Sequence, residues 1–148
     1  MKGFKKKIFT MMLVCAVACM MFALPVMAAS SSFSKSTVKL NAMNGGSSVT
    51  SSLSSGSTPS GASITQVKLA LNVARGTDPY TLYVKSPNGV WHAYNGPTSS
   101  TTIYLSDFNN ENPYGTWKFY IVNNGVSYNG NIYPTSTVTV SATVSYSY

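Results

Sequence analysis

The chain has 148 residues and a formal net charge of +7, with ten Lys or Arg, three acidic residues and one histidine. This length suits a single domain. With so few acidic residues and histidines, the chain has few side chains that could catalyse hydrolysis or bind a metal. Four of the basic residues lie in the leader described next, so the rest of the chain has a net charge of +3. We therefore predict no nucleic-acid partner.

Residues 1–28 are predicted to form a signal peptide. Four lysines precede an apolar stretch over residues 8–24, and Pro25 then leads to small residues around a cleavage point after Ala28, with Ala29 as the alternative. An uncleaved membrane anchor and a lipoprotein-type site at Cys19 are weaker alternatives, because Pro25 and the small residues favour cleavage. The expected location is outside the cell, with membrane contact only through the leader before cleavage.

Both cysteines, Cys15 and Cys19, fall within this leader. The remaining 120 residues, 29–148, have no cysteine and form no disulfide, so a packed core must stabilise them. Residues 29–63 are rich in Ser, Thr and Gly, a composition typical of a loop or linker and common in exported bacterial surface proteins. Within this segment only residues 36–42 are predicted as a short edge strand.

From residue 64 onward apolar and polar residues alternate with a period of two, which predicts half-buried β-strands. No apolar pattern with helical spacing occurs. Asn-Gly pairs, which favour tight hairpin turns, punctuate the chain at 44–45, 88–89, 95–96, 124–125 and 129–130. Many short antiparallel strands joined by polar turns predict a sandwich or a barrel. The alternating runs are 64–74, 80–86, 101–108, 115–123 and 136–148.

The order of several short motifs resembles a known domain family. An alternating strand is followed by a turn containing Asp78, then by Ser-Pro-Asn-Gly at 86–89, by "GTWKFYIVNNG" at 115–125 and by a final alternating strand. This order resembles the P domain, or Homo B domain, which follows the catalytic domain of kexin-like and subtilisin-type proprotein convertases. The resemblance covers residues 62–147. It departs from the family at Asp78, one residue out of register, and at Asn123 or Asn124, where an Asp is common.

The resemblance implies an all-β fold, an antiparallel jelly-roll-like β-sandwich of galactose-binding-like type, over residues 64–148. In convertases this domain stabilises its catalytic neighbour, whereas this copy is expected to be free-standing, without a preceding protease. The matched residues also have plain structural roles. Pro87 and Gly89 suit a turn, Gly115 lets the chain enter a strand close to another backbone, and Trp117 is expected in the core.

The residue inventory argues against an enzyme. His92 is the only histidine, no Gly-x-Ser-x-Gly motif occurs, and only Asp107 and Glu111 lie close enough in sequence to suggest a carboxylate pair. A zinc site is excluded because the chain after the leader has one histidine and no cysteine, too few of the usual zinc ligands. No cofactor is predicted. Calcium is left open, with Asp78, Asp107 and Glu111 as its candidate ligands.

Aromatic residues point instead to binding. The candidate ligand-binding residues are Trp91, Tyr94, Tyr114 and Tyr128, all expected in loops, and Tyr83, Tyr104 and Tyr120 are expected at outward strand positions. Tyrosine is also a good strand former, which is the structural alternative. The first functional hypothesis is a secreted, non-catalytic P-domain-like module that binds or stabilises an extracellular protein, such as a subtilisin-type protease. The second is a carbohydrate or cell-wall binding module.

Overall fold

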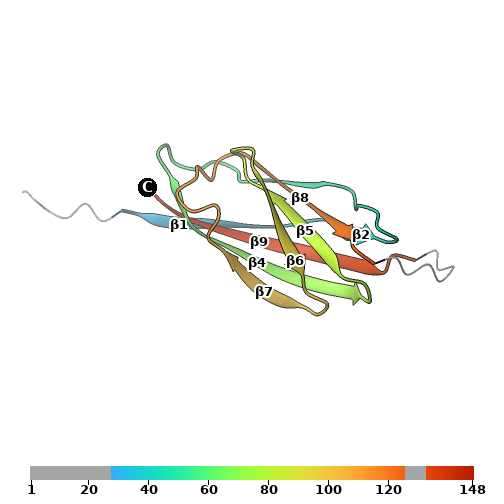
Figure 1. Cartoon of the computed structure of the whole chain (residues 1–148). Helices are drawn as coiled ribbons and strands as arrows, with labels where there is room; N and C mark the ends of the chain where they lie inside the picture. The colour runs from blue at the N-terminus through green and yellow to red at the C-terminus, as the bar shows by residue number, and fades with distance from the viewer. Residues whose placement is uncertain (1–27, 126–132) are drawn as a thin grey trace, which may run out of the picture.

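The computed structural model describes residues 28–125 and 133–148, which form two antiparallel β-sheets packed face to face (Figure 1). Sheet A has the strand order β1-β9-β4-β7, with β2 also paired to β9, and sheet B has the order β3-β8-β5-β6. The predicted all-β class, an antiparallel jelly-roll-like β-sandwich, is confirmed. No helix in the described part of the chain could cross a membrane. The strands are β1 (Ser30–Ser36), β2 (Leu40–Ala42), β3 (Ser51–Ser54), β4 (Ser63–Gly76), β5 (Tyr80–Lys85), β6 (Trp91–Gly96), β7 (Thr101–Leu105), β8 (Thr116–Asn123) and β9 (Ser136–Ser147).

The Ser-rich segment before residue 64 differs from its prediction. It contains β1, β2 and β3 rather than a loop or linker with one edge strand. Strand β1 pairs with β9 along seven residues, and hydroxyl pairs such as Ser34 with Thr143, 2.6 Å apart, reinforce the pairing. Phe33 is its one side chain packed on the core. Hydrogen bonding to a neighbouring strand, rather than apolar burial, holds this segment in the sheet, so composition alone does not reveal it.

Strands β4 and β9 form the long centre of sheet A (Figure 1). Strand β9 has β4 on one side and β1 and β2 on the other, so the Ser/Thr/Val-rich C-terminal strand has no free edge. The inward residues of both strands are apolar and alternate with polar outward residues, as the sequence predicts. The buried positions are Val67, Leu69, Leu71, Val138, Val140, Ala142 and Val144.

The register of sheet B determines which side chains face the core and which face away from it. Strand β8 pairs with β5 so that Val84 lies opposite Phe119 and Leu82 opposite Ile121, all four fully buried. The intervening positions, Tyr83 opposite Tyr120 and Lys85 opposite Lys118, therefore face away from sheet A.

Trp117 is the largest fully buried side chain, with 1% of its surface exposed. Its ring meets Phe108 edge-on at 5.3 Å between centroids, and its indole N–H donates a hydrogen bond to the Pro113 carbonyl at 3.4 Å. Gly115, at φ 129°, lies against Pro87, and a Cβ added to this glycine would stand 2.8 Å from the Pro87 Cβ. The two motifs that carry the P-domain resemblance thus contact each other in space.

The Asn-Gly pairs have different outcomes. Those at 44–45 and 88–89 form turns, in which the Gly46 N–H bonds the Met43 carbonyl and the Gly89 N–H bonds the Ser86 carbonyl. The pair at 95–96 lies at the end of β6 instead of in a turn. The Tyr80 ring covers Gly96, and any Cβ at this position would collide with that ring. The pair at 129–130 lies outside the described residues.

A buried polar cluster closes one end of the sandwich. The side-chain amide of Asn123, at the end of β8, donates to Ser136 Oγ at 2.9 Å and to Asp78 at 3.4 Å, while its oxygen accepts from the Gly125 N–H at 3.0 Å. Ser136 Oγ also bonds the Asp78 carbonyl at 3.1 Å. These bonds tie sheet B, sheet A and the β4–β5 connection together at a point hidden from water.

We expect Trp117→Ala to lower the free energy of unfolding by about 3–5 kcal/mol, because it empties the centre of the core. Urea titration followed by far-ultraviolet circular dichroism measures this change. The matched control is Trp91→Ala, whose side chain is 40% exposed and whose loss should change stability by about 0.5 kcal/mol or less. Equal losses for the two variants would contradict the burial described here.

Candidate functional site

Three aromatic rings gather on the outer face of sheet B. Tyr83 and Tyr120 face each other across β5 and β8 and stack with ring centroids 4.7 Å apart and an interplanar angle of 2°. Trp91, at the start of β6, meets Tyr120 edge-on at 5.0 Å. We call this cluster, together with the outward lysines Lys85 and Lys118, the aromatic surface.

The two lysines lie at one end of this cluster. Lys85 and Lys118 occupy directly opposed positions on β5 and β8, and the Lys85 ammonium lies 5.7 Å from the centre of the Trp91 ring. A cation over an indole face is an attractive contact, which places the Lys85 charge beside the exposed tryptophan. The surface therefore combines flat apolar area with fixed positive charge.

The ligand residues predicted from sequence do not form one site. Trp91 and Tyr94 lie on opposite faces of β6, because residues three apart on a strand point to opposite sides. Tyr94 is half-buried and packs against the core, whereas Tyr114 is 62% exposed in the loop before β8. Tyr104, also 62% exposed, is on the outer face of sheet A, opposite Lys68. Tyr128 lies outside the described residues.

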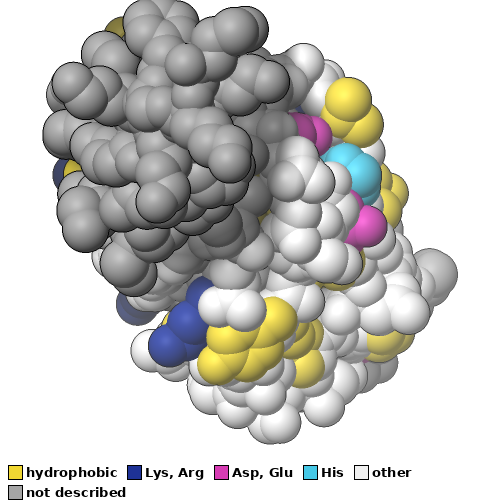
Figure 2. Space-filling view, turned by 90° about the vertical axis from the view of Figure 1, so that its left-hand side faces the viewer, with side chains coloured by type: hydrophobic (Ala, Val, Ile, Leu, Met, Phe, Trp, Pro, Cys, Tyr) yellow, Lys and Arg dark blue, Asp and Glu magenta, His cyan; other side chains and the backbone are white. Residues whose placement is uncertain are grey.

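His92 and Tyr94 belong to a separate cluster on the inner side of β6. The His92 ring packs edge-on against Phe108 at 4.7 Å, and the Tyr94 hydroxyl donates to Asp107 at 2.8 Å. Figure 2 shows the histidine at the surface between acidic side chains, with lysine and arginine elsewhere on that face. Burial, this hydrogen bond and the Asp107 charge all raise the pKa of Tyr94 above its ordinary value.

The three carboxylates considered for calcium do not gather at one point, because Asp78 lies far from Glu111. Asp78 is buried in the Asn123 cluster beyond the end of β4, while the Glu111 carbonyl bonds the Ile64 N–H at the start of the same strand. A strand of this length separates its ends by roughly 40 Å. Asp107 accepts from Tyr94, and Glu111 accepts from the Asn88 amide at 2.8 Å. Among the described residues, no group of three or more His, Cys, Asp or Glu could hold a metal.

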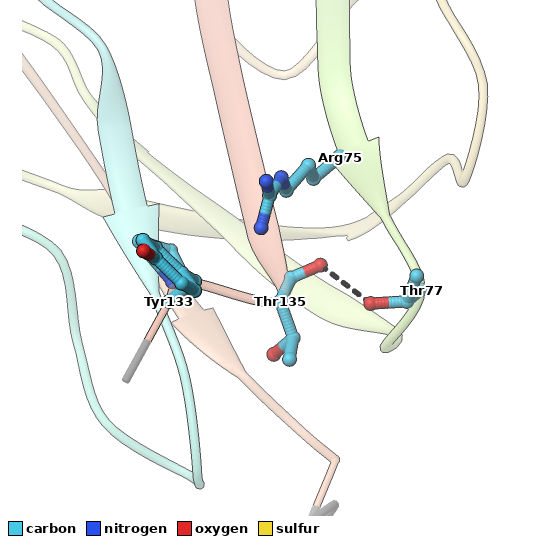
Figure 3. A pocket seen from close by; sticks show the side chains of 5 residues that line it. Arg75, Thr77, Tyr133 and Thr135 are labelled. Atoms are coloured by element: carbon cyan, nitrogen blue, oxygen red, sulfur yellow. Dashed lines mark hydrogen bonds between the residues drawn. The ribbon is translucent and has the colours of Figure 1, made fainter. Parts of the chain in front are cut away.

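A pocket of about 270 Å³ opens where β4 and β9 meet the β4–β5 connection (Figure 3). The β4–β9 pairing is irregular between Val73 and Arg75, and the Arg75 guanidinium lies 5.7 Å from the centre of the Tyr133 ring. Thr77 Oγ1 donates to the Thr135 carbonyl at 3.0 Å. The polar groups of this pocket thus largely contact one another, and we assign it a role in closing this end of the fold.

Sequence reasoning named Tyr83 and Tyr120 only as outward tyrosines and did not single out Lys85 or Lys118. Within each strand the sequence does indicate a shared face. Tyr83 and Lys85 are two residues apart, as are Lys118 and Tyr120, so the two side chains of each pair point to the same side of the sheet. The missing information was the pairing of β5 with β8, which joins Lys85 to Lys118, 33 residues on, and Tyr83 to Tyr120, 37 residues on.

No family model matches the chain, and no curated protein matches it. Among solved structures, the chain is similar to the crystal structure of FLHE, at 15% identity and a TM-score of 0.49, over 82% of this chain and 98% of that one. It is also similar to a family two carbohydrate esterase from Cellvibrio japonicus, at 11% identity and a TM-score of 0.37, over 82% of this chain and 36% of that one. Turnip yellow mosaic virus gives 13% identity and a TM-score of 0.40, over 82% and 94% of the two chains. None of the three is a P domain, and we argue function from the residues of this chain.

Alkaline pH should destabilise the protein through its buried tyrosines. Burial raises the pKa of Tyr80 to about 12, and that of Tyr94 is also raised. Because these phenols ionise more easily in the unfolded chain, their contribution to stability is complete below about pH 10 and is lost as the pH rises towards the folded pKa. Urea midpoints across this range, with tyrosinate absorbance, measure the effect.

Two phenylalanine variants provide the control for this titration. Tyr94→Phe should reduce the alkaline loss of stability, whereas Tyr104→Phe, at an exposed position, should leave it unchanged. A Tyr104→Phe variant that flattened the pH dependence as much as Tyr94→Phe would contradict the assignment.

Proposed function

We propose that the protein is a secreted, non-catalytic module that binds a polymer outside the cell through the aromatic surface. The observation that carries the proposal is the gathering of Trp91, Tyr83 and Tyr120 on the outer face of sheet B, away from the core. Exposed Trp and Tyr provide a large contact area at low entropic cost and are common in recognition surfaces. Export is supported by the leader pattern of residues 1–28.

A non-catalytic role is supported by the surroundings of the titratable groups. His92 packs on Phe108, Asp107 accepts from Tyr94, and Asp78 lies within the buried Asn123 cluster. Hydrolysis of esters or glycosides by side chains needs an activated nucleophile or two facing carboxylates, and these contacts assign the available groups to structure.

A glycan is the partner class that the geometry supports best. Sugar rings present flat apolar faces that stack on aromatic side chains, while the polar tips of tyrosines bond their hydroxyls. The surface also contains two lysines, and lysine is depleted at the centres of protein–protein interfaces. The glycan hypothesis, second on sequence alone, therefore takes first place.

A protein partner is the second candidate. It is favoured by the contact between Pro87 and Gly115, which joins the two motifs that resemble the P domain. If the chain acts as P domains do in convertases, its partner would be a subtilisin-type protease. Co-purification with such a protease from culture medium, together with a longer protease half-life, would support this candidate over a glycan.

We expect Trp91→Ala and Tyr83→Ala each to weaken binding to isolated cell-wall polysaccharide by about tenfold or more, since each removes a stacking ring. Co-sedimentation with purified wall material measures the affinity. The control is Tyr104→Ala, which removes a more exposed ring, at 62% against 40% for Trp91, from the other sheet. Wild-type affinity in both surface variants would contradict the proposed site, provided that their thermal midpoints match the parent protein.

A further inference from the structure

The opposed lysines on the aromatic surface need an explanation beyond folding. Lys85 and Lys118 are direct cross-strand partners, which places their Cβ atoms about 5 Å apart on the same face. Like charges at such positions destabilise a sheet pair. A negatively charged group bound between or above the two ammonium groups would convert this repulsion into attraction.

The strands of sheet B supply no countercharge. None of β3, β5, β6 and β8 contains an Asp or Glu. The three acidic residues of the chain lie outside these strands: Asp78 is buried, Asp107 is bonded to Tyr94, and Glu111 is bonded to Asn88 in the turn between β5 and β6. The outer face of sheet B is thus positive by composition, in a chain with few charges.

The position of Lys85 links this charge to the rings. Its ammonium lies over the Trp91 ring, and Trp91 in turn contacts Tyr120. A sugar stacked on the rings would place its ring substituents within reach of the lysines. The surface is formed by side chains from three adjacent strands, which suits a chain of sugars better than a single small molecule.

We infer that the ligand of the aromatic surface is an anionic polysaccharide, whose sugar rings stack on Trp91 and the tyrosine pair while its carboxylate or phosphate groups bind Lys85 and Lys118. This inference rests on the proposed function and specifies its ligand. Acidic proteins and single-stranded nucleic acids also offer negative charge, and they serve as competitors in the test below.

The test measures binding of the full-chain protein, produced with its leader, to three probes: polygalacturonate, a mannan bearing phosphate groups and the neutral polymer dextran. We expect at least one anionic polymer to bind about tenfold more tightly than dextran, with an affinity that falls as salt is added. The two anionic probes distinguish a carboxylate from a phosphate ligand.

Substitutions separate the charge from the rings. The double variant Lys85→Gln/Lys118→Gln should lose the preference for the anionic polymer and its salt dependence, while Lys68→Gln, a lysine beside the exposed Tyr104 on sheet A, should keep both. Trp91→Ala should weaken binding to every polymer. Relief of the lysine repulsion should also leave the double variant at least as stable as the parent protein.

Three results would overturn the inference: equal affinity for dextran and the anionic polymers, an anionic preference that survives in the double variant, or tighter binding to single-stranded DNA or an acidic protein than to either anionic polymer. The first two would leave the proposed function intact as long as Trp91→Ala still weakened glycan binding. If neither anionic polymer nor dextran bound, and Trp91→Ala had no effect on binding to wall material, the proposed function would fail as well.

Discussion

The packing of Trp117 between the two sheets is the constraint on which the rest of the molecule depends. The indole fills the space beside Phe108, and its neighbours Phe119 and Ile121 follow it into the core. Since strand side chains alternate, burying these three commits Lys118 and Tyr120 to the opposite face. A shift of one residue would expose the core and bury a lysine, so the register is strongly specified. The fold therefore determines the composition of the outer surface.

The Asn123 cluster constrains the far end of the same strand. A buried side-chain amide without partners would cost roughly 1–3 kcal/mol, and here its donors and acceptor are met by groups from β9, by Asp78 and by the backbone after β8. This arrangement holds Asp78 as a structural group and separates it from Asp107 and Glu111. The separation of Asp78 from the other two carboxylates is thus a consequence of how the sandwich is closed.

Alternation made most of the fold predictable, because a half-buried strand shows its pattern within a few residues. Strands β5, β7, β8 and β9 fall within the alternating runs, and β4 extends past its run at both ends. Strand β1 was missed because its place depends on hydroxyl and backbone bonds to β9, more than a hundred residues away. The candidate site was only partly predictable for a similar reason. Trp91 could be identified as exposed, but its neighbours come from strand pairing, which local sequence does not encode.

The two outer faces of the sandwich differ in a way that bears on function. The outer face of sheet A is lined largely by small hydroxyl side chains that hydrogen-bond in pairs across the strands, Ser34 with Thr143 and Ser36 with Ser141. These hydroxyl groups satisfy one another, and the exposed Tyr104 on the same face lies opposite Lys68. The outer face of sheet B has stacked rings and opposed lysines instead. The rings expose apolar area to water, and like-charge repulsion disfavours the lysine pair. The hydroxyl groups on the outer face of sheet A satisfy one another, whereas the opposed lysines on the outer face of sheet B repel one another. The outer face of sheet B is therefore the better candidate for recognition.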